Sequence, residues 1–91
     1  MKANPDFTLR MIGDLSLIVP LKAPDFKKEQ MITTNESGVL LWRRIEEGCT
    51  EEELVRELQS VYEIDWDTAR SDLQIFLESL RRAGALLEGD G

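Results

Sequence analysis

The sequence changes from a strand-like to a helical pattern within ten residues, TTNESGVLLW, which run from Thr33 to Trp42. Two β-branched threonines come first, and a large apolar run follows the polar group Asn35-Glu36-Ser37. Asn35 suits the cap of a helix, because its side chain can accept hydrogen bonds from the free backbone N–H groups of the first turn. The chain therefore divides into a β-forming half before this point and a helical half after it.

Three strands are expected in the first half. Residues 7–21 have the pattern of a β-hairpin, with strand-forming runs on either side of Gly13-Asp14. Glycine accepts the positive φ that a two-residue hairpin turn requires. Pro20 cannot donate a ladder bond and suits a strand end or an edge. Gln30–Thr34 is predicted to form a third, short strand.

Three helices are expected in the second half. The first covers roughly residues 36–46, and the third, capped by Asp65, covers roughly 66–83. The second begins at a capping box, in which Thr50 and Glu53 each bond the backbone N–H of the other. The order of elements is thus β-β-β-α-α-α, which predicts an α+β domain with an N-terminal three-stranded antiparallel sheet.

Cys49 is the only cysteine in the chain, so no internal disulfide can form. It precedes the Thr50 cap, and Leu54 follows at the fourth helical position, which is the spacing of a hydrophobic staple. The sequence therefore favours a structural role for Cys49 over a chemical one.

The 91 residues are enough for one domain, 1–91, with an ordered core over about 7–88. The chain has no histidine, which removes the usual general base and the commonest zinc ligand. Acid–base chemistry would depend on carboxylates alone, and most of these lie at positions expected on solvated helix surfaces. The sequence predicts no catalysis, no cofactor and no metal site.

The net charge of −7 argues against a nucleic-acid partner, because such binding draws most of its affinity from cationic contacts to phosphate. The same charge disfavours anionic membranes. No apolar run approaches the roughly 20 residues that span a bilayer, and MKANPDFTLR has no apolar segment of signal-peptide length. The expectation is a cytoplasmic protein.

Three segments, MITTNESGVLLWRRIEEGCTEEELV, YEID and FLESLRRAGALLE, resemble the pyrroloquinoline-quinone biosynthesis protein D family. That family is the parent of the recognition element for precursors of ribosomally synthesised, modified peptides (RiPPs). The shared marks are an Asn-Glu-Ser-Gly turn into a helix, a Gly-x-Thr-x-Glu-Glu-Leu-Val second helix and a Phe-Leu-x-x-Leu-x-x-x-Gly-x-Leu ending. The chain departs from the family at Thr34, where members often have leucine, and at Trp66, where many have proline.

The resemblance implies a winged-helix-like fold and a peptide chaperone without enzymatic activity. Members bind the leader of a precursor peptide as an added strand beside the third helix, and present it to a modifying enzyme, often a radical SAM protein. The peptide-binding residues that this implies, together with the helical spacing of the third helix, are Gln30, Met31, Ile32, Thr33, Arg70, Leu73, Gln74, Leu77 and Arg81. The opposite flank of that helix, with Asp72, Ile75 and Ser79, is the alternative wall.

The physics of a small sheet agrees with this expectation. An edge strand presents unpaired N–H and C=O groups, and proteins usually protect such an edge with charge or proline, which residues 30–34 lack. The flank with Arg70 and Arg81 suits a leader with hydrophobic anchors and acidic residues. Two other functions stay open: a winged-helix DNA-binding protein, and a structural subunit of a larger enzyme. The same edge could pair two protomers, so the state is a monomer or a weak homodimer.

Overall fold

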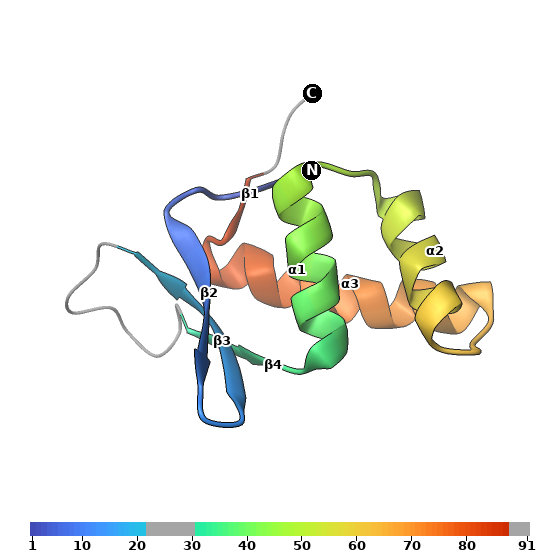
Figure 1. The fold of residues 1–91 in the computed structure, drawn as a ribbon. Coiled ribbons are helices and arrows are strands. Elements are labelled where there is room, and N and C mark those ends of the chain that lie inside the picture. Colours follow the sequence, from blue (N-terminus) through green and yellow to red (C-terminus); the bar gives the residue numbers. More distant parts are fainter. Residues whose placement is uncertain (22–30, 88–91) are drawn as a thin grey trace.

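The computed structural model describes residues 1–21 and 31–87, in which three helices pack beside a small sheet (Figure 1). The elements are β1 (Lys2–Ala3), β2 (Phe7–Ile12), β3 (Leu15–Pro20), β4 (Ile32–Thr34), α1 (Glu36–Glu47), α2 (Glu51–Val61), α3 (Trp66–Ala83) and β5 (Leu86–Leu87). The predicted order of three strands and three helices is confirmed, with a short strand added at each end. Of the predicted third strand, Ile32–Thr34 is extended and paired, and Gln30 lies outside the described residues.

The main sheet is antiparallel, with the order β2-β3-β4. The two-residue turn between β2 and β3 is the predicted Gly13-Asp14, and Gly13 has the positive φ, 60°, that the turn requires. β4 then pairs with β3, with Ile32 opposite Ile18 and Thr34 opposite Ser16. β4 is therefore an edge strand of this sheet.

A second, two-stranded sheet joins β1 to β5 and was not expected from the sequence. Lys2 lies opposite Leu87 and Ala3 opposite Leu86. The side-chain amide of Asn4 also donates to the carbonyl of Gly84, at 2.8 Å. These contacts hold the segment before the hairpin against the segment after α3 (Figure 1).

All three helices begin at the caps that the sequence predicts. The side chain of Asn35 accepts from the backbone N–H of Gly38 at 3.0 Å. Thr50 and Glu53 form the reciprocal capping box, with bonds of 3.1 and 2.8 Å. Asp65 accepts from the backbone N–H of Thr68 at 2.8 Å. Local sequence thus fixes where each helix starts, independently of how the helices pack.

The core forms where the apolar faces of the helices meet the inner face of the sheet. Trp42 is fully buried at its centre, with Ile18 from β3 and Leu54 from α2. Cys49 and Ile64 pack against this cluster from just before α2 and α3, as hydrophobic staples require. Burial, with a smaller effect of the Glu53 carboxylate, raises the pKa of the Cys49 thiol, which keeps the thiol neutral. None of the described helices is long and apolar enough to cross a membrane.

The cap of α3 makes part of the stability depend on pH. Hydrogen bonds from the side chain and the backbone N–H of Thr68 lower the pKa of Asp65 from its ordinary value of 3.8. A lowered pKa in the folded state stabilises the fold above the unfolded pKa, and this contribution is lost as the pH falls through the folded value. We expect Asp65→Asn, which keeps a capping side chain but cannot ionise, to lower the midpoint of urea unfolding at pH 6, and we expect this difference from the wild type to shrink as the pH falls below 3.8. Asp67→Asn, at the second residue of α3, is the control. A constant difference between wild type and Asp65→Asn across this range would contradict the prediction.

Candidate functional site

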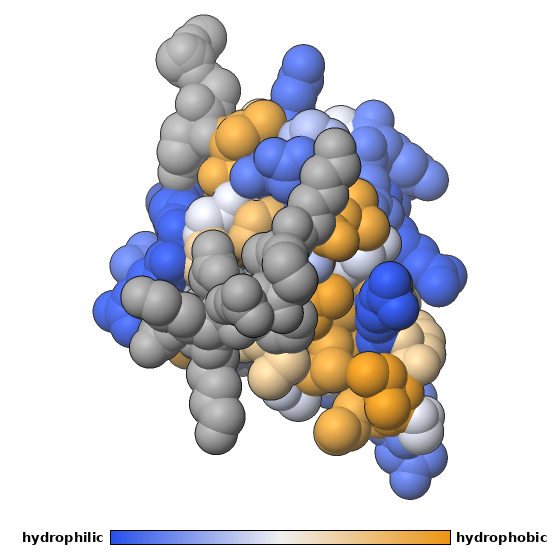
Figure 2. Space-filling view, turned by 90° about the vertical axis from the view of Figure 1, so that its left-hand side faces the viewer, coloured by the Kyte–Doolittle hydropathy of each residue, from blue (hydrophilic) through white to orange (hydrophobic). Residues whose placement is uncertain are grey.

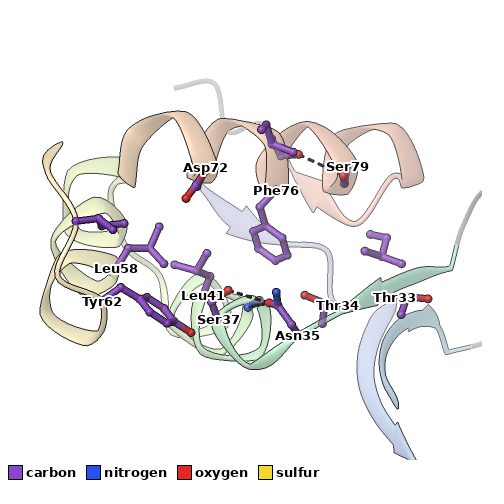
Figure 3. Close-up of a pocket in the computed structure, with 14 residues that line it drawn as sticks. Thr33, Thr34, Asn35, Ser37, Leu41, Leu58, Tyr62, Asp72, Phe76 and Ser79 are labelled. Carbon is purple, nitrogen blue, oxygen red and sulfur yellow. Dashed lines mark hydrogen bonds between the residues drawn. The ribbon is translucent and has the colours of Figure 1, made fainter. Parts of the chain in front are cut away.

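An opening of about 760 Å³ lies between β4, the first turn of α1, the end of α2 and α3 (Figure 3). Its walls come from segments that are far apart in the sequence. The lining residues are Ile32, Thr33, Thr34, Asn35, Ser37, Gly38, Leu41, Leu58, Tyr62, Ile64, Asp72, Ile75, Phe76 and Ser79. A pocket of this size is in the range of ligand-binding sites in proteins. We refer to it as the groove.

The groove runs along the edge of β4 and not over one of its faces. Successive residues of a strand point to opposite faces of the sheet. Ile32 and Thr34 are half-buried toward the core side, Thr33 is exposed on the other side, and all three line the groove. Only a cavity beside the strand contacts three consecutive residues in this way, so the backbone edge of β4 borders the groove.

The alternation of hydrogen-bonded residues along each strand of the sheet identifies which backbone groups face the groove. The N–H of Leu21 donates to the carbonyl of Asp6 at 2.7 Å, which continues the hairpin ladder beyond Pro20. Since bonding alternates along an antiparallel pair, Leu17 and the other odd residues of β3 bond to β2, and its even residues face β4. Ile32 and Thr34, opposite even residues, therefore bond to β3. The N–H and C=O of Thr33 point the other way, into the groove.

At Gly38, three of the segments that line the groove, β4, α1 and α3, come close together. Gly38 is buried in the first turn of α1, and a Cβ atom there would overlap the side-chain oxygen of Thr34. The same Cβ would lie 3.3 Å from Cε1 of Phe76 on α3. The absence of a side chain at Gly38 thus allows β4, α1 and α3 to meet at one point.

The α3 wall carries an unusual amount of apolar surface. Ile75 is 68% exposed, the largest exposure among the hydrophobic residues identified as exposed in the described chain. Phe76 is half-buried, and its ring points into the middle of the groove (Figure 3). One turn further along, the hydroxyl of Ser79 donates to the carbonyl of Ile75 at 3.2 Å. An apolar wall of this kind is suited to aliphatic or aromatic side chains of a bound molecule.

The far end of the groove is also apolar. Leu41 and Leu58 are buried in its floor, while Tyr62 and Ile64 follow the end of α2. Tyr62 is 39% exposed, and in Figure 3 its ring lies on the α2 side of Phe76. The groove therefore extends beyond the end of β4 toward α2.

The structure brings only part of the predicted site to the groove. Ile32 and Thr33 line it, Met31 is half-buried beside it without lining it, and Gln30 lies outside the described residues. The five residues predicted on α3 do not line it. Leu73 and Leu77 are fully buried in the core.

The remaining predicted residues of α3 face α2 or solvent. The amide of Gln74 donates to a carboxylate oxygen of Glu51 at 3.3 Å, and the guanidinium of Arg81 lies 3.9 Å from the other oxygen. Arg70 is exposed. Gln74 and Arg81 therefore fasten α3 to the start of α2, and the geometry favours the alternative flank, with Asp72, Ile75 and Ser79, as the groove wall.

The apolar groove residues that were not predicted as part of a site are Leu41, Leu58, Tyr62, Ile64 and Phe76. Leu41, Leu58 and Phe76 lie on the apolar stripes of their helices, and a stripe does not reveal which of its members border a cavity. Ile75 gave the one signal in the sequence, because it interrupts the polar face of α3.

Half of the described lysine and arginine side chains lie in ion pairs, four of eight. Arg44 lies 3.2 Å from Glu57, and Arg56 lies 2.9 Å from Glu52. Arg82 lies 3.5 Å from Glu78. Nothing in the described part of the chain supports the DNA-binding alternative, and the net charge of −7 argues against it. In the described part of the chain, no group of three or more potential ligands could hold a metal ion.

A separate apolar patch lies at the turn of the β2–β3 hairpin. Met11, Ile12 and Leu15 are each more than half exposed. Hydrophobic side chains gather low on this side of the molecule, at the height of the hairpin turn (Figure 2). None of the three lines the groove, so substitutions there can serve as controls for the groove.

Comparisons with known proteins agree with this geometry. The family model described as coenzyme PQQ synthesis protein D matches residues 24–86. Among solved structures, "TbiB1 in complex with the TbiA(beta) leader peptide" is similar in fold, with a TM-score of 0.77, 24% identity and full coverage of both chains. "Lasso peptide synthetase B1 complexed with the leader peptide" has a TM-score of 0.73 and 17% identity, over 94% of this chain and 95% of that one. Among curated proteins, none matches.

Proposed function

The chain belongs to the PqqD family, coenzyme PQQ synthesis protein D, and from this we propose that it is a non-catalytic peptide-binding protein. It holds the leader of a ribosomally synthesised precursor peptide and presents it to a modifying enzyme. The observation that carries the proposal is the edge of β4, where the backbone groups of Thr33 face an apolar groove. An open edge beside side-chain pockets is what strand addition requires.

The solved relatives support the same use of the fold. Both similar structures are complexes with a leader peptide, by their own descriptions. The lack of histidine and the single carboxylate in the groove, Asp72, favour binding over acid–base chemistry. The modifying enzyme would be a radical SAM protein or another RiPP maturase.

The energetics explain why both the edge and the groove are needed. Thr33 offers two backbone groups, and Met31 and Asn35, the next positions that point away from β3, offer about two more. Four such bonds contribute roughly 2–6 kcal/mol in total, whereas ordering a flexible peptide costs about 2–5 kcal/mol or more. Micromolar affinity needs about 8 kcal/mol. Two or three apolar anchors, each contributing about 1.5–3 kcal/mol on burial, must supply the difference, and the walls around Ile75, Phe76 and Tyr62 can receive them.

The proposal is tested by NMR titration of the ¹⁵N-labelled chain. The probes are synthetic peptides that copy the N-terminal halves of short reading frames beside the gene. We expect one of them to bind with micromolar or tighter affinity and to shift the amides of Thr33, Asn35 and Ile75. The control variant Leu15→Ser, at the hairpin turn, should bind equally well.

Two results would reject the proposal in different ways. Shifts confined to Arg70, Gln74 and Arg81 would return the site to the other flank of α3. Saturable binding to duplex DNA, together with no response to any of the peptides, would remove the peptide-binding function altogether.

A further inference from the structure

We infer that the groove selects leaders with a lysine or arginine about three residues from the segment that pairs with β4, and that Asp72 receives this cation. The inference rests on the proposed function and names the chemistry of its ligand. The leader charge that it assigns is positive, whereas the sequence, through Arg70 and Arg81, favoured an acidic leader.

Asp72 is the only charged side chain among the fourteen residues that line the groove. It is exposed, and it forms no ion pair with another residue of the described chain. In Figure 3 its carboxyl group extends from α3 to the side of the groove, on the α2 side of the Phe76 ring. No cationic side chain of the groove pairs with this carboxylate, so it is available to a cationic side chain of a bound peptide.

The surroundings of Asp72 suit the whole of a long cationic side chain and not its charge alone. Leu41 and Leu58 form an apolar floor on the same side of Phe76, against which the methylene groups of lysine or arginine can pack (Figure 3). The ring of Tyr62 lies at this end too, and an aromatic face attracts a cation. Floor, ring and carboxylate together favour a basic residue over a small or purely apolar one.

The spacing follows from the helix that forms the wall. Asp72 and Ser79 are seven residues apart on α3, which is about 10 Å at 1.5 Å per residue. Ser79 lies at the β4 end of the groove and Asp72 at the α2 end (Figure 3). An extended peptide covers about 10 Å in three residues, so a residue placed at Asp72 is about three positions from the segment beside β4.

The charge of the whole chain acts in the same direction. The formal net charge of −7 attracts a basic segment at long range and raises its rate of association at low salt. Arg81, the cation predicted for an acidic leader, instead lies near Glu51 and Glu78. A leader with acidic residues near its anchors would meet repulsion from the chain as a whole.

The experiment is a selection from a phage library of random dodecapeptides against the full chain. With the wild type we expect lysine or arginine to be enriched at one position, about three residues from a β-branched or aliphatic run. Asp72→Asn should lose this preference but still select the same run, and Asp72→Lys should select glutamate or aspartate there. Asp67→Asn, on the same helix but away from the groove, is the matched control and should select as the wild type does.

One selected peptide is then used to measure how much its basic residue contributes to the affinity. Replacing its basic residue by norleucine keeps the apolar stem and removes the charge. We expect binding to the wild type to weaken about two- to fivefold at low salt and less at 1 M salt, with no loss in Asp72→Asn.

The outcomes separate this inference from the function on which it rests. Selected peptides without a preferred cation, or the same cation preference in Asp72→Asn, would overturn the inference and leave peptide binding intact. Failure to enrich any peptide with either wild type or control would overturn both.

Discussion

Thr33→Pro is expected to abolish leader binding in a protein that remains folded. The N–H of Thr33 points into the groove, so its loss takes no bond from the sheet and leaves a carbonyl of the guest strand without a donor. A lost bond and an unsatisfied acceptor together cost about 2–4 kcal/mol, roughly a 30- to 800-fold loss of affinity. Proline is tolerated on an edge strand whose N–H faces outward. Fluorescence polarisation with a labelled leader measures the affinity, and circular dichroism checks the fold.

The neighbouring positions provide the controls. Thr33→Val keeps the backbone N–H and nearly the same shape, and should bind within about threefold of the wild type. Ile32→Pro removes a bond between β4 and β3 and should lower the stability of the fold itself. If Thr33→Pro folds and binds like the wild type, the guest does not pair with this edge.

Helix starts were the part of the fold that sequence could predict best, because a cap depends on a few adjacent residues. Asn35, Thr50 and Asp65 each bond a backbone N–H three residues on, so the information is local. The pairing of β1 with β5 joins residues more than 80 positions apart through two residues on each side. No periodic pattern accompanies so short a pair, and its position depends on how α3 ends.

For the groove, the sequence indicated the edge of one strand and left two flanks of α3 open as the facing wall. A short uncharged strand that stops at a capped turn indicates an open edge, and Ile32 and Thr33 do line the groove. The helical wheel of α3 offers two flanks of similar composition, and which one faces β4 is decided by tertiary packing. The groove side is the one whose Phe76 meets Gly38, while Gln74 on the other side meets Glu51.

Gly38→Ala is expected to destabilise the fold, although alanine is the better helix former. The intrinsic gain is at most about 1 kcal/mol. The new Cβ would overlap the hydroxyl oxygen of Thr34, lie 2.9 Å from its Cβ, and press on the Phe76 ring. Overpacking of this kind costs about 1–3 kcal/mol, and the side chain of Thr34 is β-branched and cannot easily turn away. We expect a net loss of about 1–2 kcal/mol, seen as a lower urea midpoint.

The same substitution should also weaken leader binding, by at least tenfold in the folded fraction, because relief of the overlap moves the end of β4 away from α1 and α3. The double variant Thr34→Ala/Gly38→Ala removes the hydroxyl that meets the new Cβ and should recover part of both losses, so that the two substitutions are not additive. If Gly38→Ala proves as stable as the wild type, or if the double variant shows simple additivity, the close approach of β4, α1 and α3 at this glycine is not what sets the width of the groove.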